Sequence, residues 1–193
     1  FRETINLKTN TFSDTYWLRK EASLGMYAVE NQLLIGKPET PRPTKIDFNL
    51  TVDGVPIKVT KNVVRRYAER DKGEIYEPFE ILPTVTTKLK NKIIIFPDDM
   101  PQTVSVEVRA GANNVKGKLS LKVPVNWKVS PKEIDFNIQQ KNDKKTVEFL
   151  VRPSENQSEG KLEVVVISDG KSYKKELVEI NYNHIPKQSV LLN

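Results

Sequence analysis

The chain has no cysteine and only one histidine, His184, among its 193 residues. Without cysteine there is no disulfide, no thiol nucleophile and no cysteine-ligated zinc site. A Ser–His–Asp triad would have to use His184 as its base. These two shortages exclude the commonest metal-binding and nucleophilic motifs.

Long apolar runs are also missing. The longest have four or five residues, whereas a transmembrane helix needs about 20. The sequence therefore predicts no membrane insertion. Phe1 is not an initiator methionine and no basic–apolar signal pattern follows it, so we expect the sequence to begin inside a longer protein.

The charge is weakly positive, with 31 Lys and Arg against 25 Asp and Glu and a net charge of +6. Basic residues alternate with acidic ones, and only Val64-Arg65-Arg66-Tyr67 combines clustered arginine with an aromatic residue. A nucleic-acid interface concentrates cations on one face. We therefore expect solvated strand faces and no nucleic-acid partner.

Alternation of apolar and polar residues dominates the second half of the chain and predicts antiparallel strands. Turn signals such as Asp169-Gly170 separate the runs. With residues 93–96 as a first strand and 173–182 as a last one, about seven short strands read as an immunoglobulin-like β-sandwich. The alternating apolar positions are Val104, Val106 and Val108; Leu119, Leu121 and Val123; Ile134, Phe136 and Ile138; Val147, Phe149 and Val151; and Leu162, Val164 and Val166.

The first half also reads as β structure. Alternation on either side of Asp53-Gly54 predicts a hairpin, with Val63, Val64 and Tyr67 extending its second strand and a further strand at 84–89. The proline-rich residues 37–43 predict an extended surface connection, and residues 16–29 predict irregular structure packed on a sheet.

The fold class is thus all-β, with two tandem immunoglobulin-like β-sandwich domains. The predicted boundaries are 1–90 for an N-terminal β-rich domain, 91–183 for the second domain and 184–193 for an exit segment leading to a further region.

Two short motifs invite a catalytic reading. Pro97-Asp98-Asp99 places two carboxylates after an apolar run, as many metal sites do, but Met100-Pro101 follows and no histidine is near. We interpret it as a turn. His184 precedes Ile185-Pro186 in the expected exit segment, and general-base catalysis would need a nucleophile and an orienting acid beside it. We predict no catalytic residue, no metal and no cofactor within this chain.

The two tryptophans suggest a different kind of site. Trp127 lies between two predicted strands, where a tryptophan is most often buried in the sandwich. Trp17 lies beside Tyr16 and Arg19, and aromatic side chains next to an arginine are typical of binding surfaces. Tyr16, Trp17 and Arg19 are therefore the candidate residues for contact with a glycan or with a neighbouring domain.

Several short segments, spread over nearly the whole chain, form an ordered series. They are Tyr16-Trp17-Leu18-Arg19, Leu24-Gly25-Met26-Tyr27, Leu34-Ile35-Gly36, Pro38-Glu39-Thr40-Pro41, residues 73–80, Trp127-Lys128-Val129-Ser130-Pro131 and His184-Ile185-Pro186. This series resembles the region downstream of the catalytic domain in large PIG-L (LmbE-like) deacetylases of the Bacteroidetes. Residues 92–182 are also similar to the NEW3-type immunoglobulin-like module.

This resemblance implies a parent enzyme that removes acetyl groups from N-acetylglucosamine-type substrates with zinc held by a His-Pro-Asp-Asp motif and a later histidine. The nearest match here is Phe96-Pro97-Asp98-Asp99, in which Phe96 replaces the ligand histidine, so no catalytic residue carries over.

The implied role is a non-catalytic accessory region, a spacer or docking scaffold whose partners are other domains of the parent chain. The resemblance also implies a periplasmic or extracellular location. The alternative is a carbohydrate-binding module that recognises cell-wall or extracellular glycans through Tyr16, Trp17 and Arg19.

Overall fold

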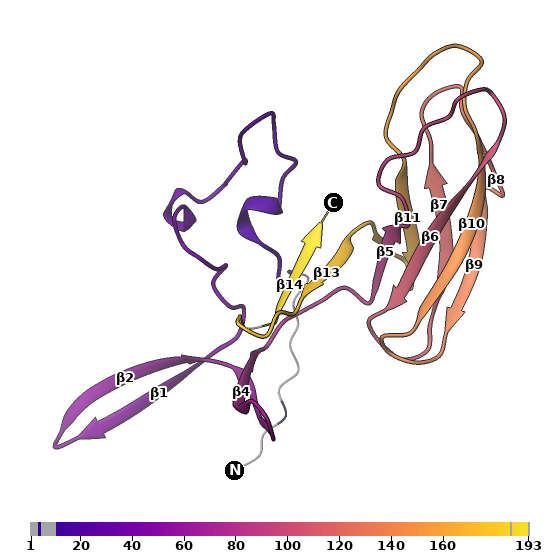
Figure 1. Ribbon diagram of the computed structural model, residues 1–193. Helices are drawn as coiled ribbons and strands as arrows, with labels where there is room; N and C mark the ends of the chain where they lie inside the picture. Colours follow the sequence, from indigo (N-terminus) through magenta and orange to yellow (C-terminus); the bar gives the residue numbers. More distant parts are fainter. Residues whose placement is uncertain (1–3, 5–10, 186, 193) are drawn as a thin grey trace. The chain divides into compact units, whose positions relative to one another are not determined.

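The computed structural model describes residue 4, residues 11–185 and residues 187–192. The described chain is all-β, with two 3-10 turns as its helical elements (Figure 1). It divides into two compact units: unit 1 comprises Phe1–Leu82 and Glu179–Leu191, and unit 2 comprises Pro83–Val178 with Leu192–Asn193. The chain therefore leaves unit 1, completes most of unit 2, and returns.

Unit 2 consists mainly of two four-stranded antiparallel sheets. Their strand orders are β5-β6-β10-β8 and β12-β11-β7-β9. The strands are β5 (Val85–Leu89), β6 (Gln102–Ala110), β7 (Val115–Lys122), β8 (Lys128–Ser130), β9 (Glu133–Ile138), β10 (Lys144–Arg152), β11 (Glu163–Ser168) and β12 (Lys171–Tyr173).

The inward-facing side chains of the two sheets form one hydrophobic core. From Val104 in β6 and from Val147 in β10, every second residue is buried, because successive side chains of a strand point to opposite faces. Phe149 and Leu119 are the largest side chains that are fully enclosed. The five alternating runs in the sequence of this unit are confirmed as β6, β7, β9, β10 and β11.

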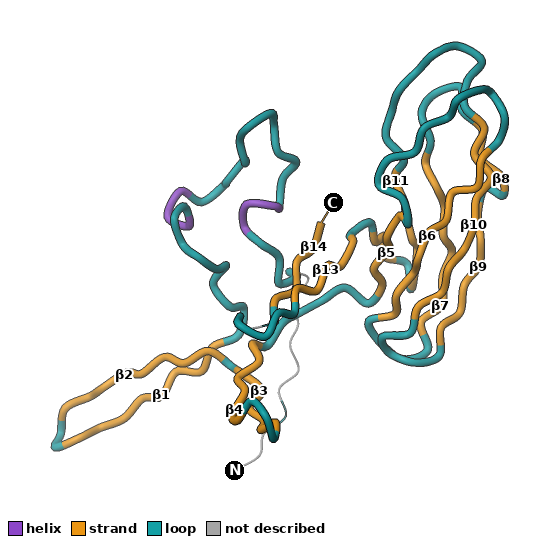
Figure 2. Tube along the Cα trace, in the orientation of Figure 1, coloured by secondary structure: helices purple, strands orange, loops and turns teal. Residues whose placement is uncertain are grey.

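Two expected strands of this unit are wrong. Residues 173–182 do not form one strand, because β12 ends at Tyr173 and Glu176–Ile180 is a separate strand that pairs with Gln188–Leu192. Residues 93–96 lie in the long connection between β5 and β6 (Figure 2), where Ile93 and Ile95 are 83% and 78% exposed. Ile94 and Phe96 pack against the core, so the segment covers the core without backbone pairing. The edge of the sheet is formed instead by β5, which pairs with β6.

Unit 1 contains small elements. Strands β1 (Lys45–Val52) and β2 (Val55–Asn62) form one hairpin, and β3 (Val64–Glu69) pairs with β4 (Gly73–Pro78). Strand β14 (Gln188–Leu192), which belongs to unit 1 up to Leu191, pairs with β13 (Glu176–Ile180), of which Glu179 and Ile180 belong to unit 1. The 3-10 turns are η1 (Tyr16–Leu18) and η2 (Gln32–Leu34). Residues 184–193, expected as an exit segment, thus include a paired strand.

Two turns follow from glycine and aspartate chemistry. Asp53 and Gly54 have φ values of 50° and 80°, and Asp169 and Gly170 have 48° and 72°. Two consecutive positive φ angles match the right-handed twist of the flanking strands, and Asp-Gly adopts them at low cost. Both predicted hairpins, β1–β2 and β11–β12, are confirmed. The return strand ends at Asn62, and β3 belongs to a separate hairpin.

Candidate functional site

The candidate site is a cavity of about 400 Å³ within unit 1. Its walls come from residues 11–15 and 17–19, from the proline-rich residues 38–43, from Glu80, and from Ile180 and residues 188–190. A volume in the range of about 300–1,000 Å³ suits a small-molecule site.

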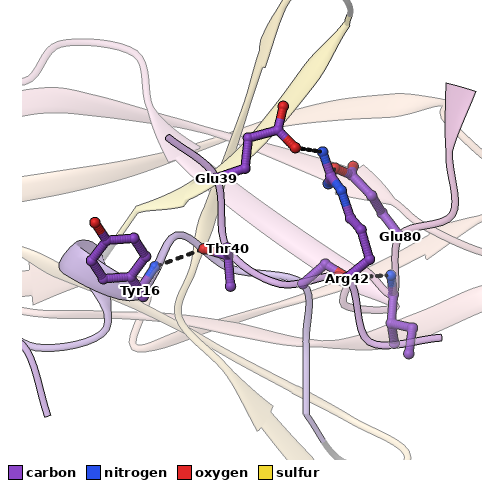
Figure 3. Close-up of polar contacts among 7 residues, drawn as sticks. Tyr16, Glu39, Thr40, Arg42 and Glu80 are labelled. Atoms are coloured by element: carbon purple, nitrogen blue, oxygen red, sulfur yellow. Dashed lines mark hydrogen bonds and ion pairs between the residues drawn. The ribbon is translucent and has the colours of Figure 1, made fainter. Parts of the chain in front are cut away.

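Tyr16 anchors one wall of the cavity. Its backbone N–H donates to Thr40 Oγ1 at 3.0 Å (Figure 3). Its hydroxyl donates to the Lys37 carbonyl oxygen at 3.1 Å. Tyr16 is 7% exposed. These links join η1 to the proline-rich segment, which has few backbone donors of its own because proline lacks an N–H.

Ser13, in the same wall of the cavity, is hydrogen-bonded to Ile81, near the end of the first chain segment of unit 1. Its backbone N–H donates to the Ile81 carbonyl at 2.8 Å, and its hydroxyl oxygen accepts from the Ile81 N–H at the same distance. This reciprocal pair connects residues 68 positions apart in the sequence. The wall is therefore held by polar contacts rather than by a large apolar core.

Arg42 bridges two carboxylates at the cavity. Its guanidinium donates to Glu39 Oε2 at 2.8 Å and to Glu80 Oε1 at 3.1 Å (Figure 3). The side chains of Arg42 and Glu80 are only 19% and 14% exposed, so this link is partly screened from water. Charge-assisted contacts of this kind are among the stronger hydrogen bonds in proteins.

The predicted residues Trp17 and Arg19 both line the cavity. The ring of Trp17 packs edge-on against Tyr16, with centroids 4.7 Å apart and an interplanar angle of 86°. Arg19 donates through Nε to Asp14 Oδ1 at 2.8 Å. Tyr16 itself does not line the cavity, but its ring packs against Trp17, which does.

The cavity also uses residues that the sequence analysis did not single out: Asp14, Glu39, Arg42 and Glu80. Three carboxylates and two guanidinium groups thus surround it, and they are paired with one another. Of these residues, Glu39 and Arg42 could have been noticed in the sequence, because they are an acidic and a basic residue within the same proline-rich segment. Their link to Glu80 depends on a distant part of the chain.

The other candidate motifs lie outside the cavity. Asp98 and Asp99 are in a bend before β6, where Asp98 accepts from the Met100 N–H at 3.0 Å and Asp99 pairs with Arg152 at 3.0 Å. Within the described residues no group of three or more His, Asp or Glu side chains could hold a metal ion.

His184 lies in an exposed turn between β13 and β14. Its ring stacks on Tyr182, with centroids 5.8 Å apart. This contact orients the imidazole but supplies neither a nucleophile nor a carboxylate.

Trp127 is half-buried and packs against the core of unit 2. Its Nε1–H donates to Ser158 Oγ at 3.0 Å, and its ring meets Phe96 edge-on at 5.0 Å. An aromatic side chain with its polar end satisfied at the margin of a core is a packing residue.

The arginine cluster on β3 faces acidic residues of β4. Arg65 pairs with Glu77 at 3.4 Å, and Arg66 pairs with Glu74. Arg65 also lies over the ring of Tyr67, 4.8 Å from its centroid. Each arginine of this cluster therefore has a carboxylate partner on the neighbouring strand. No helix in the described part of the chain is long and apolar enough to cross a membrane.

Comparison of the chain with protein-family models gave no match, and comparison with curated proteins gave none. The resemblance to the region downstream of PIG-L catalytic domains therefore stays a prediction from the sequence.

Proposed function

We propose that this chain is a non-catalytic accessory region of a multidomain PIG-L-like deacetylase, acting as a spacer or docking scaffold. The observation that carries the proposal is the construction of unit 2. Its inward positions form a continuous apolar core, while charged residues on the outer faces pair across strands, as Lys118 does with Glu133 and Lys144 with Glu107. Such a module can hold neighbouring domains apart without taking part in their chemistry.

The strand order of unit 2 supports an immunoglobulin-like fold. The order β5-β6-β10 in one sheet and β12-β11-β7 in the other corresponds to A-B-E and G-F-C of that fold. Strand β8 pairs with β10, and β9, which follows it after a short interval, pairs with β7. Between β7 and β10 the chain thus enters the first sheet with β8, returns to the second with β9 and crosses back with β10, so the middle strands depart from the order A-B-C-C′-D-E of that fold.

The accessory role is tested by assaying the chain for zinc-dependent deacetylation of N-acetylglucosamine oligomers. We expect release of acetate no faster than in buffer with zinc alone. Turnover by this chain would overturn the proposal. A parent protein that lacks an upstream His-Pro-Asp-Asp domain would overturn its assignment to this enzyme class.

A second candidate function, glycan binding, is favoured by the cavity of unit 1. Trp17 offers an apolar ring face, and the paired arginines and carboxylates offer donors and acceptors without a large net charge. A sugar ring has this combination of an apolar face and a rim of hydroxyl groups. A strongly anionic ligand would meet three carboxylates in the same walls.

Intrinsic fluorescence tests this second candidate, because the chain has two tryptophans. In a Trp127→Phe variant, Trp17 is the sole reporter. Titration with N-acetylglucosamine oligomers should change its emission at millimolar ligand, and Arg42→Met should abolish the change. Emission that stays constant in Trp127→Phe would exclude binding at Trp17.

A further inference from the structure

The β1–β2 hairpin has one face made almost entirely of apolar side chains. The cross-strand register places Phe48 opposite Val59, Leu50 opposite Ile57 and Val52 opposite Val55. Directly opposed residues of an antiparallel pair share a face. That face, here called the apolar ribbon face, consists of Ile46, Phe48, Leu50, Val52, Val55, Ile57 and Val59.

The apolar ribbon face is open to solvent. Phe48, Leu50 and Val55 are 46%, 50% and 60% exposed. All members of the face are exposed except Val59, which is half-buried. Figure 1 shows the hairpin extending from the rest of unit 1. An isolated two-stranded hairpin is marginally stable in water and needs a layer packed on its apolar side. The exposed side chains amount to roughly 500 Å², near the upper end for the largest patch on a monomer.

The opposite face of the hairpin is already suited to water. Lys58 Nζ pairs with Asp47 at 2.9 Å, and the Thr60 hydroxyl donates to the same carboxylate at 2.6 Å. The Thr60 hydrogen bond, followed by Lys58, lowers the pKa of Asp47. A partner is therefore expected on the apolar ribbon face only.

Two charges mark the ends of the apolar ribbon face. Asp53 lies in the turn at the tip, and Lys61 lies at the base opposite Ile46, on the apolar side. Neither has an ion-pair partner in the described part of the chain. From Ile46 to Val52 the strand spans about 20 Å. Two such ribbons packed face to face in antiparallel order would bring each Lys61 to the Asp53 of the other ribbon, whereas parallel order would bring like charges together.

We propose that the apolar ribbon face packs against the same face of a second copy of this chain, with the two hairpins antiparallel. The surface is self-complementary, because it is apolar along its length and carries opposite charges at its two ends, as a two-fold contact requires. Covering both faces removes roughly 1,000 Å² from water, at the lower limit for a specific interface. The dimer is therefore weak, and a lone ribbon becomes a two-layer, four-stranded unit.

Sedimentation equilibrium over about 1–300 µM protein tests the proposal, a range that covers weak association. We expect reversible dimers from the unsubstituted chain and monomers from Leu50→Asp. Since Leu50→Asp could also disturb the hairpin, a charge cycle gives an independent test. Asp53→Asn keeps a residue that tolerates positive φ, and Lys61→Gln keeps the length of the side chain.

Each of these charge-removing variants should raise the dissociation constant of the dimer about threefold to tenfold, because two symmetric ion pairs are lost. The double variant should be no weaker than either single one, since both remove the same contact. Lys45→Gln is the matched control: Lys45 is at the same end of the hairpin but on its polar face, and its loss should leave the dimer constant unchanged.

Three results would overturn the proposal. They are a monomer throughout the concentration range, additive effects of Asp53→Asn and Lys61→Gln, or equal weakening by Lys45→Gln and Lys61→Gln.

Discussion

The two units of the chain are stabilised in different ways. Unit 2 encloses a core of 15 buried residues between its sheets. In the described part of unit 1, only Tyr16 and Leu191 are buried apolar residues, and polar links such as those of Ser13 and Arg42 hold its segments together. Burial of apolar surface is the dominant favourable term in folding, so the core supplies more of the stability of unit 2 than buried apolar residues supply to unit 1. Unit 1 depends on specific contacts and leaves apolar surface available to a partner.

Removing a core side chain of unit 2 should lower the stability of that unit and leave the stability of unit 1 unchanged. Phe149→Ala should cost about 3–5 kcal/mol, because the ring is fully enclosed and its removal leaves a cavity. Urea unfolding, followed by the fluorescence of Trp127 in a Trp17→Phe background, should show this loss of stability in unit 2. The Trp17 signal, read in a Trp127→Phe background, should keep its midpoint. A common shift of both signals would show that the units unfold as one.

The corresponding change in unit 1 is Arg42→Met. It removes both ion pairs and leaves the partly enclosed Glu80 carboxylate without its partner, which should cost about 1–3 kcal/mol in the transition followed by Trp17. Arg65→Met is the matched control, because Arg65 is 74% exposed and its pair with Glu77 is long. Its effect should stay within about 0.5 kcal/mol. Equal losses from the two substitutions would contradict the role given to Arg42.

The smallest effect concerns the surface charges of unit 2. Lys174, then Lys122, lowers the pKa of Glu163 below its ordinary value of 4.5. A carboxyl group whose pKa is lowered by folding stabilises the protein above that ordinary value, and the contribution fades as the pH falls through the folded-state pKa.

Glu163→Gln should therefore reduce stability at neutral pH by at most about 0.5 kcal/mol, because the side chain is 44% exposed. Its urea midpoint should meet that of the unsubstituted chain at acidic pH. A deficit that persists below the folded-state pKa would mean that packing, not charge, is responsible.

Much of unit 2 could be predicted because its signals are local. Alternation fixes which face of a strand is buried, and Asp169-Gly170 fixes a turn. Residues 93–96 show the limit of this reasoning. An apolar run can cover a core through Ile94 and Phe96 without pairing its backbone, and the sequence contains no signal for which of two segments takes the edge of a sheet.

The cavity of unit 1 was only partly predictable. Trp17 and Arg19 stood out because an aromatic residue and an arginine adjoin in an irregular segment. Glu80 did not stand out in the sequence, because it belongs to the site only through its hydrogen bond with Arg42, which lies 38 residues away. The supporting role of Tyr16 likewise depends on Thr40 and Lys37. Such long-range contacts are set by tertiary packing, which residue types alone do not specify.

The division of unit 1 into two chain segments has a consequence for the order of events during synthesis. The cavity needs Ile180 and residues 188–190 as well as residues 11–43, yet nearly all of unit 2 is translated between them. At about 5–20 residues per second, roughly 7–30 seconds separate the synthesis of residues 11–43 from that of the strand that closes the cavity. During that interval unit 2 can fold first, so the cavity is completed only after the strands of the two sheets of unit 2 have been synthesised.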